Sequence, residues 1–256
     1  MSNDSTPATP KNAPAEELVT ELEQQGIAPG SYEVQPLDMM RRAIARRLTE
    51  SAREIPHYSL NMNMEIDAFL ALRSKINKGV TGNKVSLNDM FIKACALALT
   101  RVPEANVSFH PKGFVTHHHA DISVAVAIKG GLITPIVRQA EDKNIQDIAR
   151  EMKDLASRAR TKKLSPNEYF GGTFTISNLG MFGISSFSSI LNPPQSCILS
   201  VGAGTKQTCY RGDEPYVATI LTVTLTCDHR AVDGAAGSRW LKEFKAIIES
   251  PGEIAG

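Results

Sequence analysis

The chain has 256 residues, 42% of them hydrophobic, and its 28 basic and 27 acidic residues give a formal net charge of +1. This length fits one large domain or two small ones with a sizeable core. The balanced charge argues against binding to nucleic acid or to an anionic membrane surface. No segment approaches the roughly 20 apolar residues that span a bilayer, and the polar N-terminus is unlike a signal peptide.

The first 30 residues differ in composition from the rest. Residues 1–14 are rich in Pro, Ala, Ser and Thr, which is typical of a disordered tail or of a linker remnant. Residues 15–25 have the composition of a short helix, which the glycines within 26–30 would end. We therefore expect one folded domain over residues 31–256.

Capping residues and apolar spacing predict three helices in the first half of this domain. Asp38 begins the first, Asp67 the second, and Ser86 with Asp89 the third, because such side chains accept hydrogen bonds from the first turn of a helix. The expected ranges are 38–53, 67–77 and 87–102. An alternating strand is predicted between the first two helices, at 58–65.

Short runs rich in β-branched residues dominate the second half. The expected strands are 122–128, 132–137, 173–177, 197–202 and 217–226. Helices are predicted at 145–161 and 235–249, where apolar residues recur every three or four positions. Several helices interleaved with more strands, without a GxGxxG motif or a P-loop, predict an α+β fold with a mixed sheet.

Cysteines and arginine runs give two further indications. The four cysteines form no CxxC pair, which indicates reduced and mostly buried thiols in a cytosolic protein; they are Cys95, Cys197, Cys209 and Cys227. The basic runs at 41–47 and 158–163 have helical spacing and indicate solvated or subunit-contact faces rather than a nucleic-acid surface.

His229 is the first candidate for chemistry. It lies in the polar run Asp228-His229-Arg230, which interrupts a strand of Val, Ile, Leu and Thr. From the residues alone, it is either a hydrogen-bonded core histidine or a general base. Polar groups are costly to bury without partners. A neutral imidazole accepts the proton of a thiol, whose pKa is about 8.5, with only a small mismatch.

Two more residues are candidates beside it. Asp233 either orients His229 as a triad partner does, or pairs with an arginine and braces the turn; the short spacing favours bracing, with the arginines of 41–47 as possible partners. Ser177 either bonds its own turn or donates a hydrogen bond to an oxyanion. As a nucleophile Ser177 is less attractive, because no GxSxG elbow surrounds it.

The other histidines give no site. Consecutive residues of a strand point to opposite faces, so His117, His118 and His119 converge poorly on one ion, and we expect no metal site. His57 and His110 stand beside prolines in expected loops, without an assigned role.

Six segments together resemble the catalytic core of the dihydrolipoamide acyltransferases, the second component of 2-oxo acid dehydrogenase complexes. In chain order they are Met39–Leu48, Ile55-Pro56-His57, Gly130–Pro135, Thr173–Gly183, Asn192-Pro193-Pro194-Gln195 and Asp228–Gly234. The resemblance covers roughly residues 32–250. The turn Ser-Asn-Leu-Gly-Met-Phe-Gly is similar to that of the pyruvate (acetyl) branch.

This resemblance implies a fold, a site and a reaction. The fold is the two-layer α/β sandwich of chloramphenicol acetyltransferase, which forms trimers with active sites between neighbouring subunits. His229 matches the general base, Ser177 the hydroxyl that stabilises the oxyanion, and Asp233 the aspartate that braces the histidine turn. The implied reaction moves an acetyl group between S-acetyldihydrolipoamide and coenzyme A, in the core of a pyruvate dehydrogenase complex.

The resemblance also implies partners. They are two further copies of the chain and the other enzymes of the complex, in the cytoplasm or the mitochondrial matrix. No Asp-Lys-Ala lipoylation motif occurs, so the lipoyl group must come from a separate domain or chain. The C-terminal segment 250–256 offers only Ile254 where relatives carry a hydrophobic anchor, so we expect a trimer more than a larger cage.

Two other functions compete with this interpretation. A non-catalytic scaffold would not require Ser177, His229 and Asp233. A stand-alone acyltransferase with another acyl group or acceptor would share the site, but the Asn192-Pro193-Pro194-Gln195 segment and the arginine-rich helix favour the dehydrogenase-complex branch.

Overall fold

The computed structural model describes residues 13–255, in two compact units that divide between Ala43 and Ile44. In the first unit, α1 (Ala13–Gln24) confirms the short helix and begins slightly earlier than expected. Most of the expected tail, residues 1–12, lies outside the described residues. The predicted domain boundary at residue 30 stays a prediction.

The second unit is built on a mixed sheet, as predicted. Its strand order is β1-β11-β9-β8-β4-β7, and β10 extends the sheet beside β11. β8 runs parallel to both β4 and β9, whereas the other pairs are antiparallel. The strands are β1 (His57–Glu65), β4 (Ile122–Val124), β7 (Ile136–Val137), β8 (Phe174–Asn178), β9 (Cys197–Val201), β10 (Thr205–Arg211) and β11 (Glu214–Asp228).

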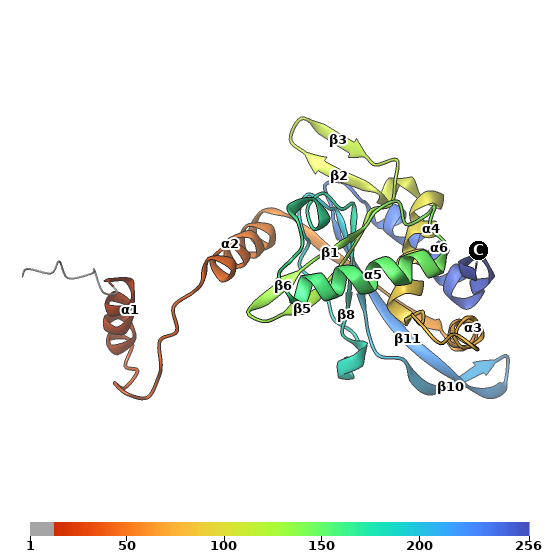
Figure 1. Cartoon of the computed structure of the whole chain (residues 1–256), viewed down its shortest axis with the longest axis horizontal. Helices are drawn as coiled ribbons and strands as arrows, with labels where there is room; N and C mark the ends of the chain where they lie inside the picture. The colour runs from red at the N-terminus through yellow and green to blue at the C-terminus, as the bar shows by residue number, and fades with distance from the viewer. Residues whose placement is uncertain (1–12, 256) are drawn as a thin grey trace, which may run out of the picture. The chain divides into compact units, whose positions relative to one another are not determined.

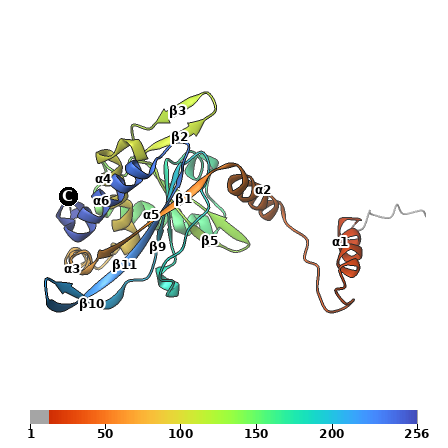
Figure 2. The same cartoon turned by 180° about the vertical axis from the view of Figure 1, so that it is seen from behind.

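Helices cover one face of this sheet, which makes the second unit a two-layer α+β sandwich. Figure 1 shows α5 in front of the sheet, and Figure 2, from behind, shows β1, β11 and β9 free of it. Between the layers, the Trp240 ring stacks on Phe244 at 5.1 Å and lies 4.9 Å from Phe174. The helices are α3 (Asp67–Ile76), α4 (Leu87–Arg101), α5 (Ile145–Arg160) and α6 (Gly234–Glu249).

Local capping was predicted correctly at two helices and wrongly at one. Asp38 accepts the Arg41 N–H at the start of α2 (Met39–Glu54), and Ser86 with Asp89 forms the capping box of α4. Asp67, in contrast, does not cap α3. Its carboxylate accepts the N–H and hydroxyl of Thr219 at 2.6 and 2.8 Å, because β11 brings both donors to it, and these bonds lower its pKa.

Two of the predicted strands are too long, and three observed strands were not predicted. Runs 122–128 and 132–137 each divide in two, giving β4 with β5 (Val126–Ile128) and β6 (Gly131–Ile133) with β7. A hairpin of β2 (Val107–His110) and β3 (Gly113–Thr116) was not predicted, and neither was β10. His57 begins β1 and His110 ends β2, so placing these histidines in loops was wrong.

Short 3₁₀ helices complete the described chain, at η1 (Pro103–Ala105), η2 (Pro166–Glu168), η3 (Gly180–Phe182) and η4 (Pro251–Ala255). All four cysteines are free, and three of them are buried, as expected. Within residues 13–255, no helix has both the length and the apolar character needed to cross a membrane.

Candidate active site

His229 stands on an exposed turn directly after β11. Its backbone N–H donates to Pro56 O at 3.0 Å, so the residue before β1 fixes the start of the turn. The imidazole packs on the Tyr58 ring, with centroids 4.6 Å apart and planes tilted by 53°. The structure therefore holds the backbone and the ring of His229 while its side chain stays accessible to a substrate.

Tyr58 does not compete with His229 as a base. Burial, and next the neighbouring Cys227, raise the pKa of the Tyr58 phenol far above its ordinary value. A phenol that stays protonated can support the imidazole by ring contact but cannot take a proton from a thiol. His229 is therefore the candidate base at this position.

The residues on either side of His229 form a clamp that was not predicted. Asp228 is 3% exposed, and its Oδ1 accepts the Arg230 backbone N–H at 3.0 Å and Nε at 2.9 Å, while Oδ2 accepts Nη2 at 2.8 Å. The Arg230 guanidinium also lies 4.1 Å from the centre of the Phe109 ring on β2. This bridge joins the residues on either side of His229 and ties its turn to the β2–β3 hairpin.

Asp233 lies at the far end of the same turn, and its carboxylate bonds to a backbone N–H rather than to an arginine side chain. Its Oδ1 accepts the Ala236 N–H at 2.7 Å and caps α6. Among the described residues, no arginine contacts Asp233. Arg47, one of the expected partners, bonds instead to Asn192 Oδ1 and Pro193 O, at 3.4 and 3.1 Å.

Ser177 lies near the carboxyl end of β8 and lines a cavity of about 470 Å³. Its hydroxyl has no hydrogen-bond partner within residues 13–255, and it is half-buried. One face of α5 forms a wall of the cavity through Ala149, Met152 and Ala156. A hydroxyl that is free and enclosed in this way can donate to an oxygen atom of a bound substrate.

Three cations surround the same cavity: Lys84, Lys153 and Arg160. All three side chains are exposed, and none has an ion-pair partner in the described part of the chain. A mostly apolar cavity with free cations at its rim suits a ligand with an apolar arm and an anionic end.

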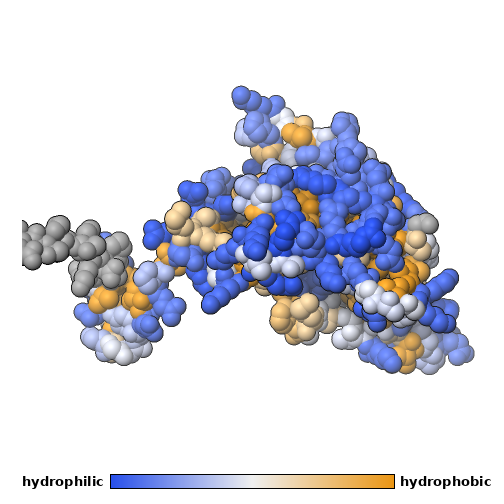
Figure 3. Space-filling model, viewed as in Figure 1, coloured by the Kyte–Doolittle hydropathy of each residue, from blue (hydrophilic) through white to orange (hydrophobic). Residues whose placement is uncertain are grey.

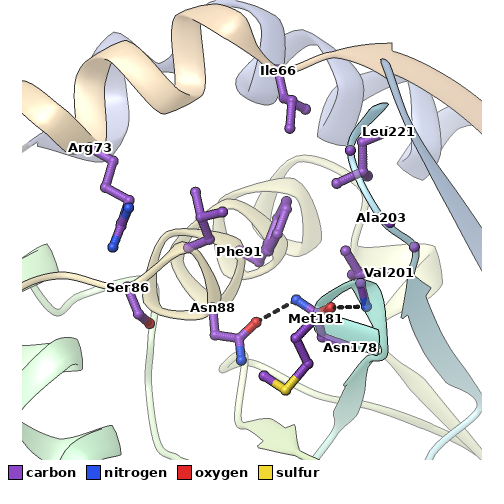
Figure 4. Close-up of a pocket in the computed structure, with 14 residues that line it drawn as sticks. Ile66, Arg73, Ser86, Asn88, Phe91, Asn178, Met181, Val201, Ala203 and Leu221 are labelled. Carbon is purple, nitrogen blue, oxygen red and sulfur yellow. Dashed lines mark hydrogen bonds between the residues drawn. The ribbon is translucent and has the colours of Figure 1, made fainter. Parts of the chain in front are cut away.

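A second cavity, of about 390 Å³, adjoins the first and shares Ser86, Asn88, Asn178 and Met181 with it. Figure 4 shows Asn88 of α4 and Asn178 of β8 joined across it, with Asn178 Nδ2 donating to Asn88 Oδ1 at 2.7 Å. The Arg73 guanidinium extends from α3 into the same region. The Ser177 cavity therefore continues into a longer cleft with a fourth cation.

Two exposed apolar side chains follow shortly after Ser177 in the chain. In η3, Met181 is 78% exposed and Phe182 is 70% exposed. Figure 3 shows an apolar protrusion where η3 lies in Figure 1. Apolar side chains this exposed are typical of a surface that another molecule covers.

The strand register places Ser177 and His229 at opposite ends of the sheet. Ser177 pairs with Ser200 of β9, which pairs with Thr224 of β11, and His229 lies five residues beyond Thr224. At about 3.3 Å per residue, this separates them by about 17 Å along the strands. One copy of the chain therefore does not bring the two side chains together.

The three consecutive histidines follow β3 rather than lying in a strand, as their prediction assumed, and they make different contacts. His117 Nε2 contacts Ser108 Oγ at 2.8 Å, and His119 Nδ1 contacts Glu141 Oε1 at 2.8 Å. Ligand atoms of His119, Glu141 and Asp142 lie within 4.8 Å of one another. Glu141 Oε2 already accepts the Ala120 N–H, so this cluster works as a brace between two loops.

Comparison with known proteins decides the family. Residues 29–255 match the model of the 2-oxoacid dehydrogenases acyltransferase catalytic domain. The chain belongs to this family.

Members of this acyltransferase family that are similar to the chain include the dihydrolipoyllysine-residue acetyltransferase component of the pyruvate dehydrogenase complex from Rhizobium meliloti. It is 49% identical over 251 residues, which is 96% of this chain and 55% of the relative. The chain thus spans about half of the length of the curated relatives it matches.

Two solved acyltransferase structures are also similar. The cubic core of a pyruvate dehydrogenase complex has a TM-score of 0.84 and 28% identity, over 97% of this chain and 99% of that one. The dihydrolipoamide acetyltransferase of Azotobacter vinelandii has a TM-score of 0.84 and 27% identity, over 97% and 99%. That structure concerns the catalytic role of a serine, a histidine 52 residues later and an asparagine four residues after the histidine.

Proposed function

We propose that this chain transfers an acetyl group between S-acetyldihydrolipoamide and coenzyme A, as the core of a pyruvate dehydrogenase complex. The observation that carries the proposal is a shared spacing. Ser177, His229 and Asp233 are separated by 52 and four residues, like the serine, histidine and asparagine of the Azotobacter enzyme. Aspartate in place of asparagine retains the side-chain oxygen that caps α6.

In this mechanism, His229 takes the proton from the thiol of coenzyme A. The thiolate attacks the acetyl carbonyl carbon, and the carbonyl oxygen becomes an oxyanion that accepts a hydrogen bond from the Ser177 hydroxyl. The carbon–sulfur bond to dihydrolipoamide then breaks, and the departing thiolate takes the proton back from the His229 imidazolium. The lipoyl group comes from a separate domain or chain.

The separation of Ser177 from His229 requires two copies of the chain at each site. A heterologous contact that closes by rotation would place Ser177 of one copy opposite His229 of the next, and a trimer provides three such sites. The exposed residues of η3, beside Ser177, offer apolar surface for this contact. We therefore propose a trimer as the unit that completes the site.

The two joined cavities are the proposed site of coenzyme A. Its pantetheine arm is long and weakly polar, which suits the apolar walls next to Ser177. Its phosphates carry the negative charge that Arg73, Lys84, Lys153 and Arg160 would neutralise at the rim.

One assay tests the reaction and its acyl specificity. Purified protein is given free dihydrolipoamide with acetyl-, isobutyryl- or succinyl-coenzyme A, and the release of coenzyme A is followed. We expect multiple turnovers and saturation with substrate, which show catalysis, and faster transfer from acetyl-coenzyme A than from the other two donors, which shows acyl specificity. A folded protein without transfer would instead support the scaffold function, and a preference for another acyl group would reject the acetyl assignment.

Co-expression of two defective chains tests whether the site lies between copies. One chain carries His229→Ala and the other Ser177→Ala, each nearly inactive alone. Equal mixing in a closed ring should restore about one quarter of the native activity, because one site in four then combines an intact histidine with an intact serine. No recovery in verified mixed oligomers would reject the two-copy site.

A further inference from the structure

His57, at the start of β1, uses both ring nitrogens in hydrogen bonds. Its Nδ1 lies 2.8 Å from Ile55 O, and its Nε2 lies 3.0 Å from the Leu191 backbone N. A carbonyl oxygen only accepts and a backbone N–H only donates, so one state satisfies both contacts: the neutral ring with its proton on Nδ1. The imidazole is therefore a fixed link between two segments, with no nitrogen left for other chemistry.

The first segment that His57 holds is the one that carries the candidate base. Pro56, its neighbour in the chain, accepts the His229 N–H at 3.0 Å. His57 itself pairs with Asp228 across the β1–β11 ladder, and Tyr58 on its other side contacts the His229 ring. Any shift of the chain at His57 therefore moves both the backbone and the ring contact of His229.

The second segment is anchored in the core. Leu191 is fully buried, and its carbonyl accepts the Ser51 hydroxyl at 2.7 Å. Shortly afterwards the chain reaches Ser196, whose carbonyl accepts the Asp228 N–H at 2.8 Å. This segment is thus a rigid support next to the His229 turn, and the Leu191–His57 bond transmits its position to Pro56.

We infer that His57 is a positioning residue for His229, which it places through Pro56 and Tyr58 by its hydrogen bond to Leu191. The inference rests on the proposed acetyl transfer. A displacement of about 1 Å at a reacting group can cost about a hundredfold in rate. We expect loss of the Leu191 bond to lower kcat about tenfold to a hundredfold and to leave KM for both substrates unchanged.

Three substitutions separate the two hydrogen bonds of His57. His57→Gln keeps an acceptor oxygen that reaches the place of Nε2, and so keeps the bond to Leu191. His57→Asn keeps a donor at the place of Nδ1 but is too short to reach Leu191, and His57→Leu loses both bonds. His118→Leu is the matched control, because His118 is exposed and has no hydrogen bond within residues 13–255.

Two measurements decide the inference: kcat and KM for each variant, and amide hydrogen exchange at His229. We expect near-native kcat and slow exchange for His57→Gln and His118→Leu, with low kcat and faster exchange for His57→Asn and His57→Leu. A purely structural role would lower the unfolding temperature and leave kcat per folded site unchanged. That result, or a Gln variant no better than Leu, overturns the inference.

The outcome also separates this inference from the function on which it rests. An unmodified protein that folds but transfers no acetyl group contradicts the proposed function, and the role of His57 with it. An active unmodified protein, whose kcat is unaffected in folded His57→Leu, contradicts the role of His57 alone.

Discussion

The two ends of the sheet differ in how firmly neighbouring groups fix their candidate residues. At one end, the His229 turn is anchored by Pro56 O on its backbone, by Tyr58 on its ring and by the Asp228–Arg230 bridge, while the side chain stays exposed. At the other end, the Ser177 hydroxyl has no partner in the described chain and lines a cavity of about 470 Å³.

The two roles require this difference. A base must hold its lone pair in one direction throughout the reaction, so fixed neighbours help it. An oxyanion donor must be free until the oxyanion forms, because a partner in the resting protein would compete with the transition state. Changes to the residues that hold His229 should therefore affect both fold and rate, whereas changes to His229 itself or at the Ser177 end should affect rate alone.

His229→Ala should give the largest loss. Without a base to take the thiol proton, we expect turnover to fall about a hundredfold to ten-thousandfold. Circular dichroism and sedimentation should stay native, because the His229 side chain is exposed. Steady-state transfer to dihydrolipoamide measures the effect, and near-native activity in this variant would reject the mechanism.

Ser177→Ala comes next, with an expected loss of about a hundredfold to a thousandfold in kcat. The unfolding temperature should not change, since the hydroxyl makes no hydrogen bond within the described residues. Ser186→Ala serves as the control, because Ser186 is an exposed serine in the segment that follows η3. If Ser177→Ala were destabilised rather than slowed, the contrast between the two ends would fail.

Arg230→Met tests the contacts that hold the His229 turn. The variant leaves the buried Asp228 carboxylate without its guanidinium, which should destabilise the fold by about 1–3 kcal/mol, together with a loss of activity. Thermal or urea unfolding measures this. Arg239→Met is the control, because Arg239 pairs with Glu104 at the surface and such pairs contribute at most about 1 kcal/mol. Equal effects of the two substitutions would contradict a clamp around His229.

The smallest effect is expected at Glu168 of η2, which within the described chain has no hydrogen bond to either candidate residue. Its hydrogen bonds, first to Arg158 and then to Ser165, lower its pKa from 4.5 to about 2. A lowered pKa means that the ionised form stabilises the fold at neutral pH, and that this contribution disappears as pH falls from about 4.5 towards 2. Glu168→Gln should lower Tm slightly at pH 7, and the difference should shrink in acid. A difference independent of pH would contradict the ion pair.

Local signals explain what the sequence predicted well. The capping box of Ser86 and Asp89 lies within one turn of α4. The roles of His229 and Ser177 were inferred from side-chain type and context, and they stay predictions. The resemblance to the family added the pairing of these two residues, which no periodicity could supply.

Contacts between distant segments explain the features that the sequence did not predict. Asp67 looked like a helix cap, and its real partner, Thr219, is 152 residues away. β10 is exposed along nearly all of its length, so it has no alternating apolar pattern. The bridge from Asp228 to Arg230 is short in sequence, but it becomes recognisable only once Asp228 is known to be buried.

The strand register has one more consequence, for how the protein works at low concentration. In the proposed mechanism, a folded single chain holds only half of a site, because the strand register keeps Ser177 and His229 at opposite ends of its sheet. Catalysis then depends on an association constant, and specific activity should decline on dilution while each chain stays folded. Assembly itself would then switch the activity on.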